Sequence, residues 1–400
     1  MTSSITNLPS LADAAWLGDP RLQKIMAVIA AEGEDVRVVG GAVRNALLGE
    51  PISDVDLATT LLPEDVMRVC KAAGLGAYPT GLAHGTITVV NKGQAFELTT
   101  LRRDVKTDGR HAVVAFTTDW REDALRRDFT INAMSCDSVG KIYDFTNGYQ
   151  DILRKRIRFV GEAELRIKED YLRILRFFRL HARYGKGLPS SAGLAACVKF
   201  KSGLKKISAE RICQELLKLV VAPRAVDTLK IMATHGILKI IIPHTDDWRA
   251  LGRLPPDEIL RLYVLAKKPA ALKERLRLSN DEADRLDALS KAPILNPTVS
   301  EQSQRKLLYY MGAQSWTDAV TVAWARSSSP RTRKSWNAVL NLPRVWPIPK
   351  FPVNGKDAIA AGLKPGPKMG ATLRQLEDWW VARDFAPTRD ELLRRIEDGN

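Results

Sequence analysis

The sequence predicts an α+β protein, in which a small mixed β-sheet within the first 150 residues precedes an all-α remainder. Residues 1–150 mix short strand-like runs, bounded by Gly, Asn and Asp, with short helical stretches. From about residue 160 onward, apolar residues recur mostly at helical spacing and no convincing strand occurs. A chain of 400 residues is also longer than one core usually supports, so two to four domains are expected.

The individual elements follow from these patterns in chain order. Strands are predicted at residues 36–40, 53–59, 84–90, 95–100 and 141–145. Helices are predicted at 21–32, 42–49, 63–73, 121–134, 169–185 and 208–220. Gly185 is expected to end the helix 169–185, and Ser208 is the expected N-cap of the helix 208–220. Pro- and Ser-rich breaks near 294–303, 327–332 and 343–353 indicate further boundaries.

The later part of the chain carries the excess basic charge. Residues 1–150 hold 15 Lys and Arg against 19 Asp and Glu, whereas residues 151–400 hold 46 against 27. A basic region behind a near-neutral one suits a polyanion such as nucleic acid, and a generally soluble basic surface is the alternative.

Other bulk properties exclude several classes. No apolar run approaches the roughly 20 residues that cross a bilayer. The first residues lack the basic start and apolar segment of a signal peptide. The four cysteines form no CxxC pair, which argues against zinc and disulfide frameworks and fits a reducing cytoplasm.

Two acidic residues stand two positions apart in the predicted strand 53–59. Alternate residues of a strand share a face, so Asp54 and Asp56 are expected to project together while Val55 and Leu57 face the core. Mg²⁺ prefers carboxylate and phosphate oxygens, and a pair of such ions can activate a hydroxyl and stabilise a leaving oxygen. Asp54 and Asp56 are therefore candidate metal ligands, with a solvated strand end as the alternative.

The segment "GGAVRN" joins an apolar strand to a helix just before these aspartates. Gly40 and Gly41 let backbone N–H groups approach a ligand closely, and a helix N-terminus favours phosphate. Arg44 adds a positive charge one turn into the helix. A tight turn with a surface arginine is the alternative, but phosphate donors beside carboxylates favour nucleotidyl transfer.

Two nearby segments add candidates. Glu97 on the predicted strand 95–100 is a possible third carboxylate that shares a metal ion, and an exposed strand glutamate is an equal alternative. The polar, Gly-containing residues 102–114 predict a mobile loop between strands.

The segment "RRDFTINAM" groups charged and amide side chains around a short predicted helix. It places Arg127, Asp128 and Asn132 next to Arg126. A sugar–phosphate site needs positive charge, a hydroxyl acceptor and an amide, which this group supplies. A cluster of helix-end salt bridges is the alternative.

Five segments occur here in a single order. They are "VVGGAVRN…SDVDLATT", "RRDFTINAM", "IRFVG", "RIKEDYLRILRFFR" and "SAERICQELLKLV". Together they resemble the class II tRNA nucleotidyltransferase/poly(A) polymerase family, with bacterial CCA-adding enzymes as the nearest likeness. The motifs cover residues 36 to about 220. The segment 354–373, "NGKDAIAAGLKPGPKMGATL", resembles a family tail motif, whereas residues 221–350 carry no recognised motif.

The resemblance implies four regions: a nucleotidyltransferase head (1–150), a helical neck that recognises the base (151–222), a helical body (223–345) and a helical tRNA-binding tail (346–400). It implies Mg²⁺ ligands at Asp54 and Asp56, in a two-metal site. Glu97 is a further catalytic candidate from the strand pattern alone. The resemblance implies NTP contacts at Gly41, Arg44 and Arg127, base recognition by Asp170 and Arg173, and a place near the nucleotide for Arg176 and Arg179. The residue patterns above add Gly40, Asp128 and Asn132 as nucleotide-binding candidates. Asn45 stands where the family often has aspartate, and we expect little loss of activity from this difference.

Hydrogen-bonding chemistry supports the assignment of base recognition. Asp170 and Arg173 are three residues apart in the predicted helix, so they are expected to share one surface. Asp only accepts hydrogen bonds and Arg only donates them. Cytosine and adenine each present an amino group beside a ring-nitrogen acceptor, whereas guanine and uracil present the reverse pattern. One Asp–Arg pair could therefore admit C and A and reject G and U.

These observations predict an Mg²⁺-dependent enzyme that adds CCA to the 3′ end of tRNA from CTP and ATP without a nucleic-acid template. The expected partner is tRNA, bound at its acceptor arm and elbow, with no membrane and no obligatory protein partner. The alternatives are a poly(A) polymerase, a CC-only adding enzyme and, remotely, a non-catalytic RNA-binding protein.

Overall fold

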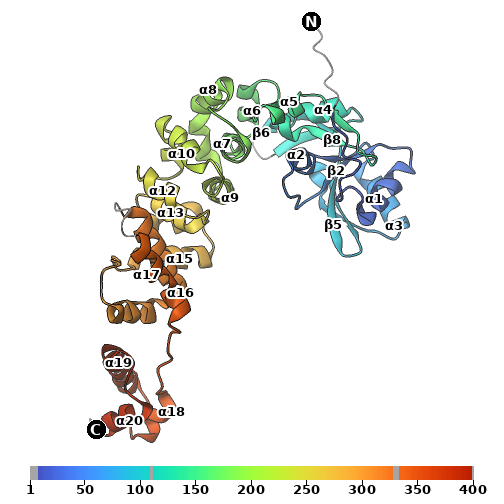
Figure 1. The fold of residues 1–400 in the computed structure, drawn as a ribbon. Coiled ribbons are helices and arrows are strands. Elements are labelled where there is room, and N and C mark those ends of the chain that lie inside the picture. Colours follow the sequence, from blue (N-terminus) through green and yellow to red (C-terminus); the bar gives the residue numbers. More distant parts are fainter. Residues whose placement is uncertain (1–7, 109–110, 328–332, 399–400) are drawn as a thin grey trace. The chain divides into compact units, whose positions relative to one another are not determined.

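A computed structural model describes residues 8–108, 111–327 and 333–398 (Figure 1). The chain forms two compact units, Met1–Ile242 and Pro243–Asn400. The four-part division into head, neck, body and tail stays a prediction. Within the described residues, no helix has both the length and the apolar character needed to cross a membrane.

The first unit contains all the named strands of the described chain. These are β1 (Val36–Val39), β2 (Asp56–Thr59), β3 (Gly76–Gly81), β4 (Thr86–Asn91), β5 (Gln94–Thr100), β6 (Arg102–Asp108), β7 (His111–Phe116), β8 (Met134–Cys136) and β9 (Ile142–Asp144). Seven of them form one sheet in the order β3-β4-β5-β2-β1-β8-β9. β2 and β5 run parallel and the other neighbours are antiparallel, which confirms the predicted mixed sheet.

Helices cover this sheet and continue beyond it. The helices of the first unit are α1 (Pro20–Ala30), α2 (Gly41–Leu48), α3 (Pro63–Ala72), α4 (Trp120–Leu125), α5 (Gly148–Leu153), α6 (Ala163–Glu169), α7 (Arg173–Tyr184), α8 (Ser191–Phe200), α9 (Ala209–Val220), α10 (Ala225–Thr234) and α11 (Leu238–Ile241). Short 3-10 turns are η1 (Leu82–His84), η2 (Thr130–Asn132) and η3 (Lys201–Lys206). α1 and α3 pack on each other and on β4, whereas α2 packs on β1, β8 and α5.

Two strand-region predictions are wrong. The strand expected at 53–59 begins only at Asp56, so Asp54 lies in the irregular segment before it. Residues 102–114 were expected to be a loop, but the described part forms the antiparallel hairpin β6–β7, since 111–116 is rich in strand-forming residues. Residues 109–110 lie outside the described chain.

Two helix predictions are also wrong in extent. The helix expected at 121–134 ends at Leu125, because Phe129 is extended and Thr130 donates its N–H to the carbonyl of Arg158. The helix expected at 169–185 is interrupted, since Asp170 is extended and its side chain accepts the N–H of Leu172. Such a local side-chain bond competes with helix formation.

The named elements in the described part of the second unit are helices and one short 3-10 turn. Its helices are α12 (Trp248–Arg253), α13 (Glu258–Leu265), α14 (Leu272–Leu276), α15 (Asn280–Lys291), α16 (Glu301–Arg326, kinked at Gly312), α17 (Arg333–Val345), α18 (Gly355–Ala360), α19 (Pro367–Ala382) and α20 (Arg389–Glu397), with the 3-10 turn η4 (Pro269–Ala271). The break predicted near 294–303 lies mostly between α15 and α16, which begins at Glu301, whereas the break predicted near 343–353 starts inside α17, which contains Pro343 and ends at Val345. Most of 327–332 lies outside the described residues.

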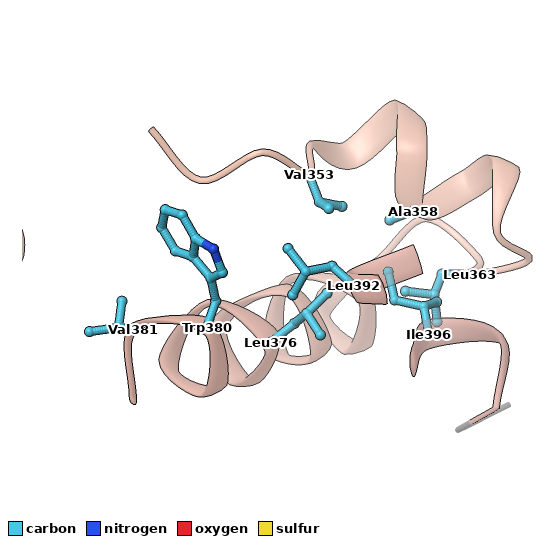
Figure 2. Close-up of a cluster of buried hydrophobic side chains, with 8 residues drawn as sticks. All are labelled: Val353, Ala358, Leu363, Leu376, Trp380, Val381, Leu392 and Ile396. Carbon is cyan, nitrogen blue, oxygen red and sulfur yellow. The ribbon is translucent and has the colours of Figure 1, made fainter. Parts of the chain in front are cut away.

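The end of the second unit has its own apolar cluster (Figure 2). Its buried side chains are Val353, Ala358, Leu363, Leu376, Trp380, Val381, Leu392 and Ile396. The segment 354–373 builds its helix starts: Asn354 forms a capping box with Asp357, and Pro367 opens α19. These contacts give the segment a role in helix–turn packing, and its contact with tRNA stays a prediction.

Candidate active site

The glycine turn between β1 and α2 forms one wall of the site. Gly40 has φ +73°, a conformation that other residues rarely adopt, and α2 begins at Gly41. A Cβ on Gly40 would lie 3.4 Å from Nη1 of Arg127, so this guanidinium rests directly against the turn. The turn therefore presents a helix start and an arginine side by side, a combination suited to phosphate.

The predicted carboxylates gather beside this turn. Asp56, the first residue of β2, pairs with Val39, the last residue of β1. Glu97 lies on β5, which runs parallel to β2 with Leu57 opposite Leu98. All three carboxylate residues, Asp54 included, are exposed, and Ser53 donates its hydroxyl to Asp54 over 2.8 Å.

Partial desolvation and then repulsion among these carboxylates both act on Asp56. The pKa of Asp56 is raised, first by partial desolvation of its carboxylate and then by the negative charges of Glu97 and Asp54. The positive charge of Arg127 lowers it. Within the described chain, no three His, Cys, Asp or Glu side chains form a group ready to hold a metal ion. The prediction that Asp54 and Asp56 share one strand face is wrong, because Asp56 is the first residue of β2 and Asp54 lies in the irregular segment before it.

A buried aspartate anchors the arginines of "RRDFTINAM". Asp123 is 2% exposed and accepts bonds from Arg126 at 2.6 Å and Arg127 at 2.9 Å. Burial alone would raise the pKa of Asp123, but the charges of Arg127 and Arg126 outweigh it and the pKa is lowered. The buried carboxylate of Asp123 therefore holds the guanidiniums of Arg126 and Arg127 in fixed orientations.

Asp128 and Asn132 are engaged with arginines of other elements. Arg176 on α7 donates to Asp128 over 2.6 Å, and Arg44 on α2 donates to the side-chain oxygen of Asn132. Burial would raise the pKa of Asp128, yet Arg176 and then Arg173 lower it. The alternative interpretation of a salt-bridge cluster is thus correct for part of this segment.

The proposed base-recognition residues do not pair with each other. Asp170 lies between α6 and α7 and accepts from Arg211 on α9 at 2.6 Å. Arg173 begins α7 and donates to Glu169 and to the carbonyl of Arg166. The expectation that Asp170 and Arg173 share a continuous helix is wrong, although both face the same pocket.

Arg179, one turn beyond Arg176, completes the row of arginines on α7. It donates to Glu215 on α9 over 2.5 Å. The sequence motifs assigned Arg176 and Arg179 to nucleotide binding but did not identify the carboxylate partner of either residue.

These side chains surround a pocket of about 460 Å³ in the first unit. Its described lining is Gly40, Gly41, Arg44, Asp56, Arg126, Arg127, Asp128, Asn132, Asp170, Leu172, Arg173, Arg176, Arg179 and Arg211. Of the candidates from the sequence, Asp54 and Glu97 do not line it. Seven arginines against three aspartates give the described lining a positive character that suits a triphosphate.

Arg126, Leu172 and Arg211 also line the pocket, and they were not assigned to it from the sequence. Arg126 was visible in "RRDFTINAM" as a second positive charge. Arg211 was visible only as a residue near a helix start, because its partner Asp170 is 41 residues away.

Comparison with known proteins places the chain among enzymes of one kind. Residues 36–158 match the poly A polymerase head domain, and residues 192–249 match the probable RNA and SrmB-binding site of polymerase A. The chain is 36% identical to CCA tRNA nucleotidyltransferase 1, mitochondrial, of Danio rerio, over 90% of this chain and 87% of that protein. It is 32% identical to the CCA-adding enzyme of Leuconostoc citreum, over 93% and 94%.

A solved structure agrees with these relatives. The Bacillus stearothermophilus CCA-adding enzyme in complex with CTP superposes with a TM-score of 0.79 at 29% identity, covering 95% of this chain and 97% of that one. The fold class and the resemblance drawn from the motifs are confirmed. The chain therefore belongs to the family of CCA-adding enzymes, the CCA tRNA nucleotidyltransferases, and is a nucleotidyltransferase.

Proposed function

We propose that this chain adds CCA to the 3′ end of tRNA from CTP and ATP without a nucleic-acid template, releasing pyrophosphate at each step. The observation that carries the proposal is the single pocket where the Gly40–Gly41 turn, Asp56, the arginine cluster and Asp170 meet. The names of the relatives and the CTP in the similar solved structure support this assignment.

The triphosphate is assigned to the turn and its neighbouring arginines. The free backbone N–H groups at the start of α2 favour a bound anion, and Arg44 and Arg127 add positive charge to the pocket. Arg127 is pre-oriented by Asp123, so little ordering is required when the nucleotide binds. The ribose is assigned to Asp128 and Asn132, which lie between these arginines and α7.

The carboxylates fit Mg²⁺ held jointly by protein and substrate. Mg²⁺ is commonly bound through one or two carboxylates together with substrate phosphates, so a complete protein cage is not required. Asp54 and Asp56 would hold the ions, with Glu97 adjacent. The pKa of Asp56 is raised first by desolvation and then by the charges of Glu97 and Asp54, and a bound cation would offset that repulsion. When bound, such ions stabilise negative charge on attacking and leaving oxygens.

The chain's own residues then orient the reaction. The terminal 3′-hydroxyl of tRNA attacks the α-phosphorus in line, a new O–P bond forms, and the bond to pyrophosphate breaks. Arg44 and Arg127 stabilise charge on the departing pyrophosphate. Their position against the glycine turn keeps the phosphates fixed relative to Asp56.

Base selection is assigned to Asp170 and Arg173. Each already has two partners, but a carboxylate offers about four acceptor sites and a guanidinium five donors, so both retain capacity for a base. An amino group would meet Asp170 and a ring-nitrogen acceptor would meet Arg173. Guanine and uracil would leave polar groups unpaired, at a cost of about 1–3 kcal/mol each.

The tRNA is assigned to the basic region after residue 150. Its Lys and Arg residues would contact phosphates of the acceptor arm and elbow, and the match of residues 192–249 to a probable RNA-binding model supports this.

The four cysteines are buried and free, in keeping with a reducing compartment such as the cytoplasm.

Two alternatives belong to the same enzyme class. A poly(A) polymerase of this family tends to carry an Arg-rich stretch, whereas β3 to β4 reads "GAYPTGLAHGTITVV". A CC-only enzyme tends to lack the segment that here forms β6 and β7. A non-catalytic RNA-binding protein would have no need for the carboxylates beside the pocket.

The test is incorporation on tRNA that lacks its 3′ CCA, with CTP alone, ATP alone, both, or GTP and UTP. We expect two added residues with CTP alone, three with both, and none with GTP or UTP. A ladder of many A residues would instead indicate a poly(A) polymerase. Near-normal turnover by D54A or D56A would contradict the carboxylate assignment.

A further inference from the structure

One face of the large sheet stays accessible beside the candidate active site. Along β4 and β5, buried side chains alternate with more accessible ones, as expected where one face of a sheet is covered. The helices α1 and α3 contact β4 and account for its buried face. The opposite face is left accessible to a ligand.

Side chains of this accessible face form a row across four strands, which we call the sheet-face row: Asp56, Glu97, Thr88 and Tyr78. Glu97 pairs with Thr88, and Thr88 pairs with Tyr78, in ladders that put paired side chains on one face. The parallel pairing of Leu57 with Leu98 places Asp56 next to Glu97. Since neighbouring strands lie about 4.8 Å apart, the row extends about 14 Å from Asp56 to the edge strand β3.

The row leads away from the pocket. Asp56 lines the pocket, whereas the other three members are absent from its described lining. The triphosphate is assigned to the turn after β1, and β1 and β5 flank β2 on opposite sides. An in-line displacement requires the attacking hydroxyl to lie opposite the departing pyrophosphate. The end of the tRNA therefore reaches Asp56 from the β5 side, where the row begins.

Tyr78 at the far end of the row offers an aromatic surface. It is 56% exposed. A Cβ on Gly76 would lie 3.0 Å from Cε2 and 3.4 Å from the hydroxyl of Tyr78, so the ring lies along β3 over this glycine. Exposed aromatic rings of this kind are the surfaces on which proteins stack the bases of single-stranded nucleic acid.

Threonine hydroxyls lie between Tyr78 and the carboxylates. Thr88 shares a hydrogen bond with Thr80 at 2.7 Å, and Thr86 shares one with Thr99 at 3.0 Å. Each hydroxyl has one donor and two acceptor sites, so both pairs retain capacity for ribose hydroxyls or base edges.

We propose that the sheet-face row receives the last two nucleotides of tRNA before addition, with one base stacked on Tyr78 and the terminal 3′-hydroxyl beside Asp56 and Glu97. The inference rests on the proposed function. The row contains no Lys or Arg, so it holds the RNA by stacking and by hydroxyl contacts rather than by phosphate charge.

The first experiment measures CTP incorporation by the full chain on tRNA that lacks its 3′ CCA. Y78A is expected to raise the KM for this tRNA about tenfold, the effect of one lost base stack. Y78F keeps the ring and should match the parent. The equilibrium affinity of Y78A for CTP without tRNA should change less than twofold, and the dependence of KM on salt should keep its slope, since no phosphate contact is removed.

The second experiment locates the base directly. The same tRNA carries 2-aminopurine at its last or its next-to-last position, and the fluorescence of this base falls when it stacks on an aromatic ring. At one of the two positions, the parent and Y78F should quench the fluorescence more than Y78A does.

A matched control is an exposed aromatic residue at the other edge of the sheet. Phe145 is 40% exposed and directly follows β9, the strand at the opposite end of the sheet order from β3. F145A is expected to change the KM for tRNA less than twofold. Thermal unfolding of each variant checks that it folds, and if Y78A does not, Y78L decides by the same measurements because it lacks an aromatic face.

A parental KM for Y78A together with unchanged fluorescence at both positions would overturn the proposal. Equal losses in Y78A and F145A, or an equal loss of CTP affinity in Y78A, would also overturn it, because the effect would then be general. Absence of incorporation by the unsubstituted protein would count against the proposed function, whereas an active parent with an unaffected Y78A would refute only the sheet-face row.

Discussion

Asp123 lies under Arg127, and two nitrogens of this arginine donate to the same carboxylate oxygen, at 2.9 and 3.2 Å. We expect D123N to lower stability by about 1–3 kcal/mol, since it leaves two arginines without their charge partner. We also expect weaker CTP binding, because Arg127 loses its fixed orientation. Urea unfolding and equilibrium CTP titration measure the two effects.

The exposed pair of Arg68 with Asp65, at 3.2 Å, provides the comparison for that change. D65N is expected to shift neither stability nor CTP affinity by a measurable amount, since exposed pairs contribute little. Equal effects of D123N and D65N would argue against a special role for the buried carboxylate.

Gly40 and Gly41 are expected to respond differently to alanine. Gly40 has φ +73° and ψ −121°, a conformation that few residues other than glycine adopt, so G40A is expected to cost about 1–3 kcal/mol in backbone strain and to place a methyl group against Arg127. Gly41 has no such strain, and its new Cβ would meet Nη2 of Arg44 at an ordinary 3.6 Å. G41A should therefore keep its stability and weaken CTP binding, which thermal unfolding and titration would distinguish. Full stability in G40A would contradict the assignment.

Asp56 is expected to oppose folding while it supports catalysis. Its folded-state pKa lies above the unfolded value, so its charged form destabilises the protein above that pKa, and the penalty disappears below the unfolded value. D56N should consequently be more stable than the parent at pH 7 in metal-free buffer, yet fail to incorporate nucleotides. A lower midpoint for D56N at pH 7 would show that the carboxylate is stabilising instead.

Buried His181 predicts a loss of stability on mild acidification. Burial, and then the charge of Arg224, lower its pKa from 6.5 to about 4, although a bond to Gly187 acts the other way. The unfolded chain therefore takes up a proton below pH 6.5 that the folded chain refuses until about pH 4. Stability should fall through this window by up to about 1.4 kcal/mol per pH unit.

The variant H181N removes this titration. Its stability should depend less steeply on pH between 4 and 6.5, whatever its absolute value, when unfolding is measured in denaturant at several pH values. An unchanged slope would mean that other groups dominate the acid response.

Arg211 predicts a change in nucleotide selectivity rather than in rate alone. It holds Asp170 at 2.6 Å, so R211Q should leave that carboxylate less well placed for the amino group of C or A. Discrimination against UTP and GTP is expected to fall about tenfold, the effect of one poorly made polar contact. Single-nucleotide incorporation with each triphosphate measures this ratio, and an equal loss with all four would indicate a general structural effect.

Local chemistry made much of the head predictable. The glycine turn, the helix after it, Ser208 as a helix N-cap position and the strands around residues 36, 86 and 95 follow from short-range patterns. β3, β8 and the hairpin β6–β7 were missed. β8 is three residues long and pairs with β1, which is far away in the sequence, whereas the polar residues of β6 were interpreted as a loop.

The sequence by itself determined which groups are available: two aspartates beside a glycine turn, an arginine-rich segment, and a basic helical region after residue 150. Tertiary packing alone decided their partners, such as Arg211 for Asp170 and Tyr184 for Asn45, and excluded Asp54 from the pocket lining. The physical reason is range. Residue chemistry and helix or strand periodicity act over a few positions, whereas a buried charge takes whichever opposite charge the packed helices bring within hydrogen-bond distance.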